Sequence, residues 1–356
     1  MSVKKQEQEE KVIIYMKELI IKENEAGQRF DKYLAKVLKE APKSFFYKML
    51  RKKNITLNGK KATGNEKLLE GDTVKFFLSD ETFEKFAGNT QVPRAYCHLD
   101  VVYEDKDIII INKPVGMLSQ PADDGQPSLV EYVTGYLLKK GELTEEQLKT
   151  FRPSVCNRLD RNTSGLVCAG KSLAGLQFLS GIFHDRSLHK YYLCLVKGRL
   201  EKGEHIKGYL HKNKKTNKVT VSEKQFEDSL PIETGYRPLG SNGRVTLLEV
   251  ELITGRTHQI RAHLGSMGHP LLGDAKYGDR DFNRAYTKFG VKNQLLHAYR
   301  LEIPQTGQTF SAKVPQLFEN ILNEEHLKGS YYENLEISVG VCQDDHPGSG
   351  YRNCGQ

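Results

Sequence analysis

The first third of the chain contains two helical patterns followed by short strand patterns. One helical face carries apolar residues at Phe30, Tyr33, Leu34, Val37 and Leu38. Pro42 and Ser44 end this helix and start a second one, SFFYKMLRKK. Asn58-Gly59 then lies between short apolar runs, which predicts a tight hairpin turn, and LLEGDTVKFFL predicts a further strand.

The rest of the chain is dominated by strand patterns. VVYEDKDIIIINKP predicts two strands around a turn at residues 104–107, and KYYLCLVKG, NKVTVSE and RVTLLEVEL predict three more. Helical patterns occur between them, at SLVEYVTGYLLKK and LAGLQFLSGIF. The strands form hairpin-like runs and do not alternate strictly with helices. We therefore expect an α+β fold with a mixed, mostly antiparallel sheet, flanked by helices and loops.

A length of 356 residues favours about two domains. We expect a flexible extension at 1–15, a small domain at 16–82, a polar linker at 83–94, a larger domain at 95–328 and a flexible tail at 329–356. No apolar run approaches the roughly 20 residues of a membrane span, and the N-terminal residues MSVKKQEQEE lack an apolar signal core. The six cysteines form no CxxC pair. These features favour a cytoplasmic protein with reduced thiols and no membrane partner.

The positive charge is concentrated in the small domain. Residues 28–79 contain 13 Lys and Arg against 5 Asp and Glu, and the difference of +8 equals the net charge of the whole chain. Much of it lies on and after the second helix, at Lys43, Lys48, Arg51, Lys52 and Lys53. A basic patch on a separate module is typical of a nucleic-acid partner, although a solvated helix face is the simpler alternative.

Two motifs in the larger domain contain candidate catalytic groups. NRLDRNTSGL places Asp160 between Arg158 and Arg161, and TGRTHQIRAHL places Arg256 and Arg261 near the start of a helix. A turn acid or helix cap would explain Asp160 alone. An aspartate with a pKa of about 3.9 is ionised at neutral pH, so it would serve as a base or nucleophile and not as a proton donor.

Three other patterns do not support a site. Gly165-LVCA-Gly170-Lys171-Ser172 has the letters of a phosphate-binding loop, but LVCA favours a buried strand over a loop that curls around phosphate. His258, His263 and His269 are five and six residues apart, which does not place two imidazoles on one helical face. Cys342, His346 and Cys354 lack a second cysteine pair. We therefore expect no metal site.

Together, the motifs of the larger domain resemble the RluA-type pseudouridine synthases. Asn157-Arg158-Leu159-Asp160 through Gly165 is similar to the family's central motif, with Asn157 in place of its usual histidine. INKPVGMLSQP, KYYLCLVKG, TGRTHQIRAHL and GHPLLGDAKYG resemble its other motifs, in the expected order over residues 95–325. The small domain resembles the ribosomal-protein-S-four-like, or alpha-L, RNA-binding domain.

The resemblance implies a role for each matching residue. Asp160 would initiate cleavage of the uridine N-glycosidic bond, Tyr192 would stack on the base, and Arg261 would pair with the catalytic carboxylate. Arg158 would fill the gap left in the RNA by the flipped base. Substrate contacts would come from Arg158 and from Lys113, Arg256 and His258.

The resemblance also implies the substrate. We expect a cofactor-free monomer that acts on large-subunit ribosomal RNA, with transfer RNA as a second candidate. An inactive RNA-binding protein and an RNA N-glycoside hydrolase are the alternatives, and the hydrolase would normally need another carboxylate as acid.

Removing the charge of Arg51, Lys52 and Lys53 together should weaken RNA binding and flatten its dependence on salt, because fewer counterions would then be released. Dissociation constants measured at several salt concentrations test this. An unchanged salt slope would identify these residues as an ordinary solvated face.

Overall fold

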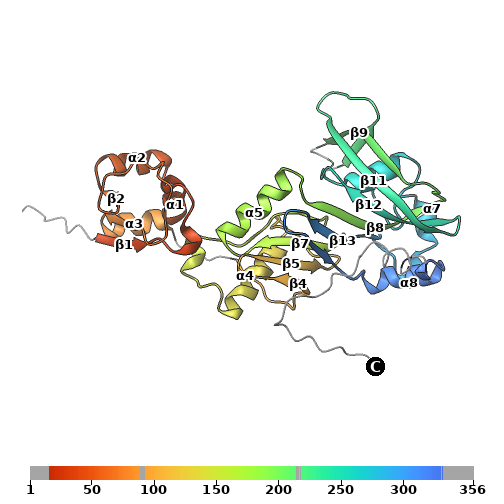
Figure 1. Ribbon diagram of the computed structural model, residues 1–356, viewed down its shortest axis with the longest axis horizontal. Coiled ribbons are helices and arrows are strands. Elements are labelled where there is room, and N and C mark those ends of the chain that lie inside the picture. The colour runs from red at the N-terminus through yellow and green to blue at the C-terminus, as the bar shows by residue number, and fades with distance from the viewer. Residues whose placement is uncertain (1–15, 89–92, 214–215, 217, 330, 332–356) are drawn as a thin grey trace, which may run out of the picture. The chain divides into compact units, whose positions relative to one another are not determined.

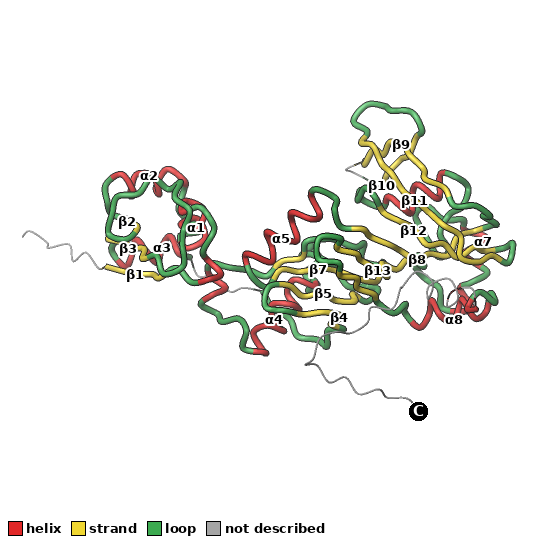
Figure 2. The backbone as a smooth tube through the Cα atoms, viewed as in Figure 1, coloured by secondary structure: helices red, strands yellow, loops and turns green. Residues whose placement is uncertain are grey.

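The computed structural model describes residues 16–88, 93–213, 216, 218–329 and 331. The predicted N-terminal extension and nearly all of the predicted tail lie outside these residues. The chain forms two compact units, residues 1–188 with 303–312 and residues 189–302 with 313–356. Figures 1 and 2 show the elements of each unit. None of the described helices has the length and apolar content needed to cross a membrane.

The first unit contains most of the helices. Its elements are β1 (Met16–Ile20), η1 (Glu23–Glu25), α1 (Phe30–Val37), α2 (Lys43–Arg51), β2 (Ile55–Leu57), β3 (Thr73–Phe77), α3 (Asp80–Ala87), β4 (Val101–Glu104), β5 (Ile108–Lys113), α4 (Leu129–Lys140), η2 (Gln147–Lys149), β6 (Ser154–Val155), β7 (Ser164–Gly170), α5 (Leu173–His184) and β14 (Gln308–Ser311).

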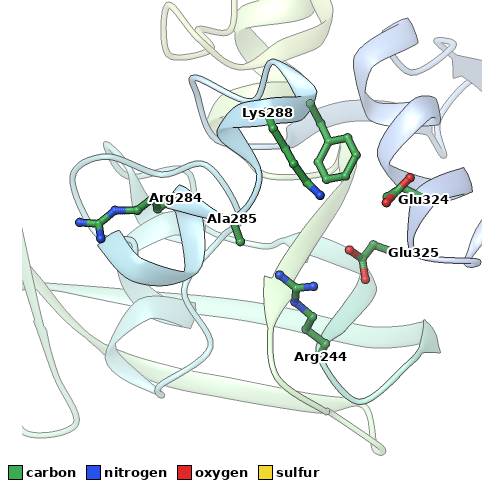
Figure 3. Close-up of a pocket in the computed structure, with 7 residues that line it drawn as sticks. Arg244, Arg284, Ala285, Lys288, Glu324 and Glu325 are labelled. Atoms are coloured by element: carbon green, nitrogen blue, oxygen red, sulfur yellow. The ribbon is translucent and has the colours of Figure 1, made fainter.

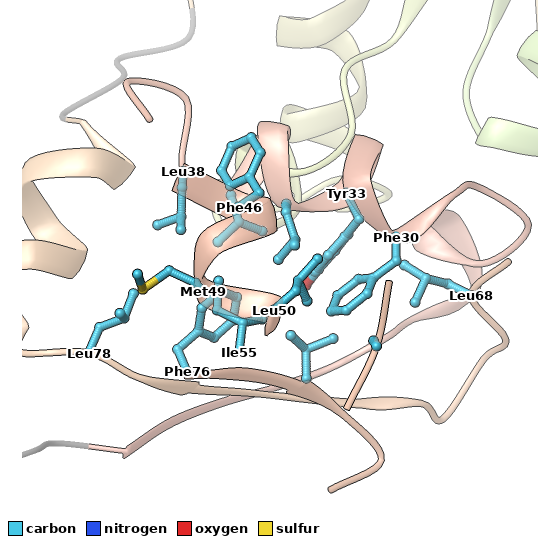
Figure 4. Packing of buried hydrophobic residues seen from close by; sticks show 14 of the residues in the cluster. Phe30, Tyr33, Leu38, Phe46, Met49, Leu50, Ile55, Leu68, Phe76 and Leu78 are labelled. Atoms are coloured by element: carbon cyan, nitrogen blue, oxygen red, sulfur yellow. The ribbon is translucent and has the colours of Figure 1, made fainter. Parts of the chain in front are cut away.

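The N-terminal part of this unit has its own apolar core between helices and a small sheet. The sheet has the strand order β1-β3-β2, and both pairs are antiparallel. The predicted apolar face of α1 is buried, and α2 contributes Phe46, Met49 and Leu50 to the same core (Figure 4). The two predicted helices are therefore confirmed, and their burial leaves the basic side of α2 exposed.

Two details differ from the sequence-based expectations. Asn58 and Gly59 do form a turn with positive φ, but no strand follows, and β2 pairs with the distant β3. A helix, α3, occupies the first part of the segment expected to be a linker. Ser79 caps this helix by accepting a hydrogen bond from the Thr82 amide, and Phe83 is buried in the core.

The rest of the first unit is built around β5, which lies between β4 and β7. These pairs and the β6–β7 pair are antiparallel. Helix α5 approaches the strands so closely that a Cβ on Gly175 would lie 2.0 Å from the carbonyl oxygen of Asp107. Helix α5 therefore packs directly against the turn between β4 and β5.

The second unit is mainly an antiparallel sheet with the strand order β10-β9-β11-β12-β8-β13. Together with the first unit it confirms the predicted α+β class. Its elements are β8 (His189–Lys197), β9 (Glu204–Asn213), β10 (Lys218–Ser222), β11 (Leu230–Ser241), β12 (Val245–Leu252), α6 (Gln259–Ser266), α7 (Arg280–Arg284), η3 (Thr287–Phe289), β13 (Leu296–Ile303), whose last residue belongs to the first unit, and α8 (Gln316–Glu324).

Different elements pack against this sheet. One core cluster joins Leu193 and Leu195 of β8 to Phe318 and Ile321 of α8. Another joins Ile232 of β11 to the helix α6. Side chains alternate between the two faces along a strand, so the even-numbered residues of β8 point to the face opposite that of Leu193 and Leu195.

Replacing Leu34 with alanine should destabilise the N-terminal core, because Leu34 is fully buried in the core cluster. Such a truncation typically costs about 2–5 kcal/mol of unfolding free energy. Amide hydrogen exchange of α1 in the full chain measures the effect. Leu69→Ala is the matched control, because Leu69 is 66% exposed and should change exchange little.

Candidate active site

Asp160 lies in the short loop between β6 and β7 and is half-buried. The loop leaves the sheet just after Cys156, whose amide donates to the Cys168 carbonyl at 2.8 Å. It returns at Thr163, whose amide donates to the Asp160 carbonyl at 3.0 Å. Asp160 therefore sits at a tight turn beside the rigid strand β7.

The segment after β5 holds the Asp160 loop from one side. The Ser119 hydroxyl donates to the Leu159 carbonyl at 2.9 Å and accepts from the Leu159 amide at 3.1 Å. The Gly116 amide donates to the Arg161 carbonyl at 2.9 Å. The backbone groups on both sides of Asp160 are thus fixed by partners from the same segment.

Lys113 is the last residue of β5, just before this segment, and is fully buried. Its ammonium donates to the carbonyl oxygens of Pro114, Met117 and Arg161 at 3.0, 2.9 and 3.2 Å. Burial lowers the pKa of Lys113 to about 8, while the Asp160 charge acts in the opposite direction. These contacts fit a residue that holds the loop, and they do not support the predicted contact with substrate.

The two arginines beside Asp160 differ in their surroundings. Arg158 is exposed, and its Nη1 lies 3.4 Å from Gln120 Oε1. Arg161 forms an ion pair with Asp124 at the surface, where such pairs contribute little to stability. Arg158 is therefore the one that the loop presents to solvent.

Tyr192 lies in the second unit, in the middle of the sheet, and is 7% exposed. It faces Val250 of β12, and Val250 faces Tyr236 of β11. Directly opposed residues of antiparallel strands share a face, so Tyr192 and Tyr236 lie on the same side of the sheet. Two residues from Tyr236, Thr234 also lies on this side, and its hydroxyl is 3.1 Å from His263 Nδ1 of α6. The register therefore places Tyr192 on the face covered by the helix that carries Arg261.

Arg261 is held by a buried carboxylate that the sequence did not identify. Its Nε and Nη2 donate to Asp274 Oδ2 and Oδ1 at 2.7 and 2.9 Å. Asp274 Oδ1 also accepts from the amides of Lys276 and Tyr277 at 2.8 and 3.0 Å. Burial raises the pKa of Asp274, but the bonds and charge of Arg261 outweigh it, so the pKa lies below its usual range.

Glycines make the Asp274 loop possible. A Cβ on Gly278 would lie 1.9 Å from the Asp274 carbonyl oxygen, and a Cβ on Gly273 would lie 2.2 Å from the Asn293 carbonyl oxygen. Gly273 also has a φ of +82°, which L side chains rarely adopt. The sequence showed a glycine-punctuated loop here, but no local pattern connects Asp274 with an arginine 13 residues earlier.

His258 and Arg256 precede Arg261 in the second unit. His258 has a positive φ of 53°, and its Nδ1 is 2.9 Å from the Tyr277 hydroxyl. Arg256 is exposed, and its amide donates to Gln259 Oε1 at 3.0 Å. Both residues lie just before helix α6, and their contacts with substrate stay a prediction.

The basic residues predicted to bind RNA are all exposed on α2 and the turn after it: Lys43, Lys48, Arg51, Lys52 and Lys53. Among the described residues, the ion pairs recorded do not involve any of these five. Their charges are therefore not neutralised by acids of the same domain.

The segment that resembles a phosphate-binding loop has a different structure. Residues 164–170 form the buried strand β7. Lys171 Nζ donates to Glu104 Oε1 at 2.6 Å, and Ser172 caps α5 by accepting from the Gly175 amide at 3.0 Å. The lysine and serine are thus used within the fold.

A pocket of about 350 Å³ lies elsewhere in the second unit. It is lined by Arg244, Arg284, Ala285, Lys288, Phe289, Glu324 and Glu325 (Figure 3), and it includes none of the predicted site residues. Glu325 accepts from the Tyr286 hydroxyl and from Asn242 Nδ2, both at 2.7 Å. Arg244 lies 4.9 Å from the centre of the Tyr286 ring. These groups connect α8 to the turn between β11 and β12.

The predicted site residues therefore fall into two groups. Lys113, Arg158 and Asp160 lie together in the first unit, and the second unit contains the other predicted catalytic and substrate-binding residues, Tyr192, Arg256, His258 and Arg261. Their meeting in one catalytic centre stays a prediction. Sequence reasoning missed Ser119 and Asp274, the two residues that hold members of these groups in place.

The pH dependence of stability should report on His263, which lies two residues after Arg261 on α6. Burial lowers the pKa of His263 to about 4. Between pH 6.5 and 4 the unfolded chain therefore binds a proton that the folded chain does not. As the pH is lowered through this range, the free energy of unfolding should decrease by up to about 3 kcal/mol. Urea unfolding of the full chain at several pH values measures this loss.

Two variants make this measurement specific. His263→Gln should flatten the pH dependence, whereas His98→Gln should leave it unchanged because His98 is exposed. If the His263→Gln variant loses as much stability as the wild type on acidification, another group is responsible.

Comparison with known proteins identifies a family for each of the two predicted domains. The family model described as RNA pseudouridylate synthase matches residues 107–266, and the S4 domain model matches residues 28–74. A human protein named RNA Pseudouridylate Synthase Domain Containing 4 has the same fold in its solved structure, with a TM-score of 0.52 at 21% identity, over 64% of this chain and 92% of that one.

Curated relatives match over most of their length. The "Ribosomal large subunit pseudouridine synthase C" of Pasteurella multocida (strain Pm70) is 32% identical over 87% of this chain and 94% of its own. The protein of the same name from Escherichia coli (strain K12) is 31% identical over 84% and 93%. The chain therefore belongs to the RNA pseudouridylate synthase family, and it carries an S4 domain before the catalytic region.

Proposed function

We propose that this enzyme isomerises specific uridines to pseudouridine in large-subunit ribosomal RNA. The observation that carries the proposal is the match to relatives named for that activity, over nearly their whole length. The setting of Asp160 supports it, because hydrogen bonds hold the backbone on both sides of a residue that is only partly buried. A reacting group needs this combination of fixed position and access.

In the proposed reaction, the Asp160 carboxylate initiates cleavage of the bond between uracil N1 and the ribose. The freed base turns in the site and rejoins the same ribose carbon through C5. The proton on C5 is then removed, and N1, which kept the electron pair of the broken bond, takes up a proton. Substrate and product have the same atoms, so the reaction needs no redox partner. Lys113 would help to hold Asp160 in place, because its ammonium group donates to the Arg161 carbonyl and its charge interacts with that of Asp160.

Tyr192 and Arg261 would act from the sheet face described above. The target base must leave the RNA stack, which costs a few kcal/mol. Stacking of the base on the Tyr192 ring would offset about 1–3 kcal/mol of this cost. Arg261 donates from Nε and Nη2 to Asp274, and its guanidinium group would pair with the catalytic carboxylate. Asp274 would thus orient Arg261 for this role.

The exposed arginines and the S4 domain would bind the RNA. Arg158 would occupy the space left by the flipped base, and Arg256 and His258 would contact nucleotides at the edge of the site. The unneutralised cations of α2 would contact phosphates and steer the enzyme to RNA. We further propose that the enzyme works as a monomer in the cytoplasm, and that transfer RNA is a secondary substrate class.

The release of tritium from ribosomal RNA labelled at uridine C5 tests the reaction. The wild type should release tritium, and Asp160→Asn should abolish release while RNA affinity stays within about twofold, because a neutral amide cannot serve as the nucleophile or base. Asp124→Asn is the matched control, since this acid is at the surface and should leave turnover intact.

The other outcomes distinguish the alternatives. Free uracil without tritium release would indicate an N-glycoside hydrolase, and RNA binding with neither product would indicate an inactive binding protein. Turnover retained by Asp160→Asn would end the proposed mechanism.

A further inference from the structure

The strand β6 is only two residues long, yet its ladder with β7 continues beyond it. Ser154 and Val155 pair with Gly170 and Ala169. The Cys156 amide extends the ladder by donating to the Cys168 carbonyl at 2.8 Å. After this bond the backbone turns away toward Asp160, which leaves the next groups on this edge of β7 without a backbone partner from β6.

The side chain of Asn157 fills this place. Its Nδ2 donates to the Leu166 carbonyl at 3.1 Å, and its Oδ1 accepts from the Cys168 amide at 2.8 Å. A carbonyl can only accept and an amide N–H can only donate, so these two partners determine which end of the side chain is oxygen. The side-chain amide thus makes the same two kinds of bond as a peptide unit of an added strand residue.

We propose that Asn157 is a positioning residue that sets where Asp160 lies relative to β7. Only two residues separate Asn157 from Asp160. Its side chain bonds to β7 at the point where the backbone leaves that strand. Its amide does not titrate in the working range, so it can serve neither as acid nor as base. The inference rests on the proposed function, because it assigns Asn157 a task in the reaction of Asp160.

This assignment explains how asparagine can stand where the resembling family has histidine. A neutral imidazole also carries one donor and one acceptor, but its two nitrogens lie on different sides of a rigid ring. The side-chain amide places donor and acceptor next to each other, as Leu166 and Cys168 require. The departure from the family pattern is therefore compatible with a correctly held carboxylate.

The kinetic test compares variants on C5-labelled ribosomal RNA. Asn157→Ala removes both bonds, and Asn157→Asp keeps the acceptor for Cys168 but loses the donor to Leu166. Both should lower kcat by about 10- to 100-fold, the usual effect of misplacing a reacting group by about 1 Å, while KM stays within about twofold. Asn157→His, which restores one donor and one acceptor, should recover part of the kcat lost in Asn157→Ala.

A variant that destabilises the same unit elsewhere is the control. Ser172→Ala removes the cap of α5 without touching the loop, so its melting temperature should fall while kcat stays near that of the wild type. If Ser172→Ala loses kcat as much as Asn157→Ala at a similar melting temperature, or if Asn157→Ala and Asn157→Asp keep wild-type kcat, the proposal is overturned.

Hydrogen exchange gives a readout that does not depend on activity. The Cys168 amide should exchange faster in Asn157→Ala and stay protected in Asn157→Asp, because only the first loses the acceptor. Unchanged protection in Asn157→Ala would overturn the inference even in an active enzyme. Absence of tritium release by the wild type would instead overturn the proposed function, and this exchange pattern would still be measurable.

Discussion

A loop that leaves a sheet must find new partners for its backbone groups, and the loop that carries Asp160 finds them in both backbone amides and side chains. Ser119 serves both backbone groups of Leu159, and Lys113 serves the Arg161 carbonyl. Asn157 serves the edge of β7 that the departing chain exposes. Buried polar groups without partners are costly, so each of these bonds restricts the loop to one conformation. The carboxylate gains a fixed position without being buried itself.

The second unit solves a related problem with an ion pair. Arg261 is nearly buried on α6, and the loop after that helix supplies Asp274 to compensate its charge. Two backbone amides complete the coordination of the carboxylate. A buried pair of this kind adds little net stability, but it fixes the direction of the guanidinium group. In both units, then, buried polar partners fix the position of a residue that the family resemblance assigns to the reaction.

Much of the fold could be predicted because it depends on local patterns. The apolar face of α1, the basic side of α2 and the buried character of β7 all follow from residue spacing, and β7 also explains why the apparent phosphate-binding loop is not one. Other features depend on contacts between distant residues. The pairing of β2 with β3, the burial of Phe83 and the bonds from Ser119 and Asp274 have no signature within a short window. The candidate residues themselves came from the resemblance of ordered motifs, since Asp160 alone has an ordinary turn composition.

The glycines of the Asp274 loop also indicate which parts of the enzyme can be redesigned. Any side chain at Gly273 or Gly278 would collide with a backbone oxygen, so the segment from 268 to 278 has almost no freedom to vary. The segment from 121 to 127, by contrast, is exposed along its whole length; within it only Gly125, with a φ of +71° that L side chains rarely adopt, should stay glycine. Efforts to retarget the enzyme to a different RNA sequence should therefore diversify the exposed segment and leave the glycine-bound loop untouched.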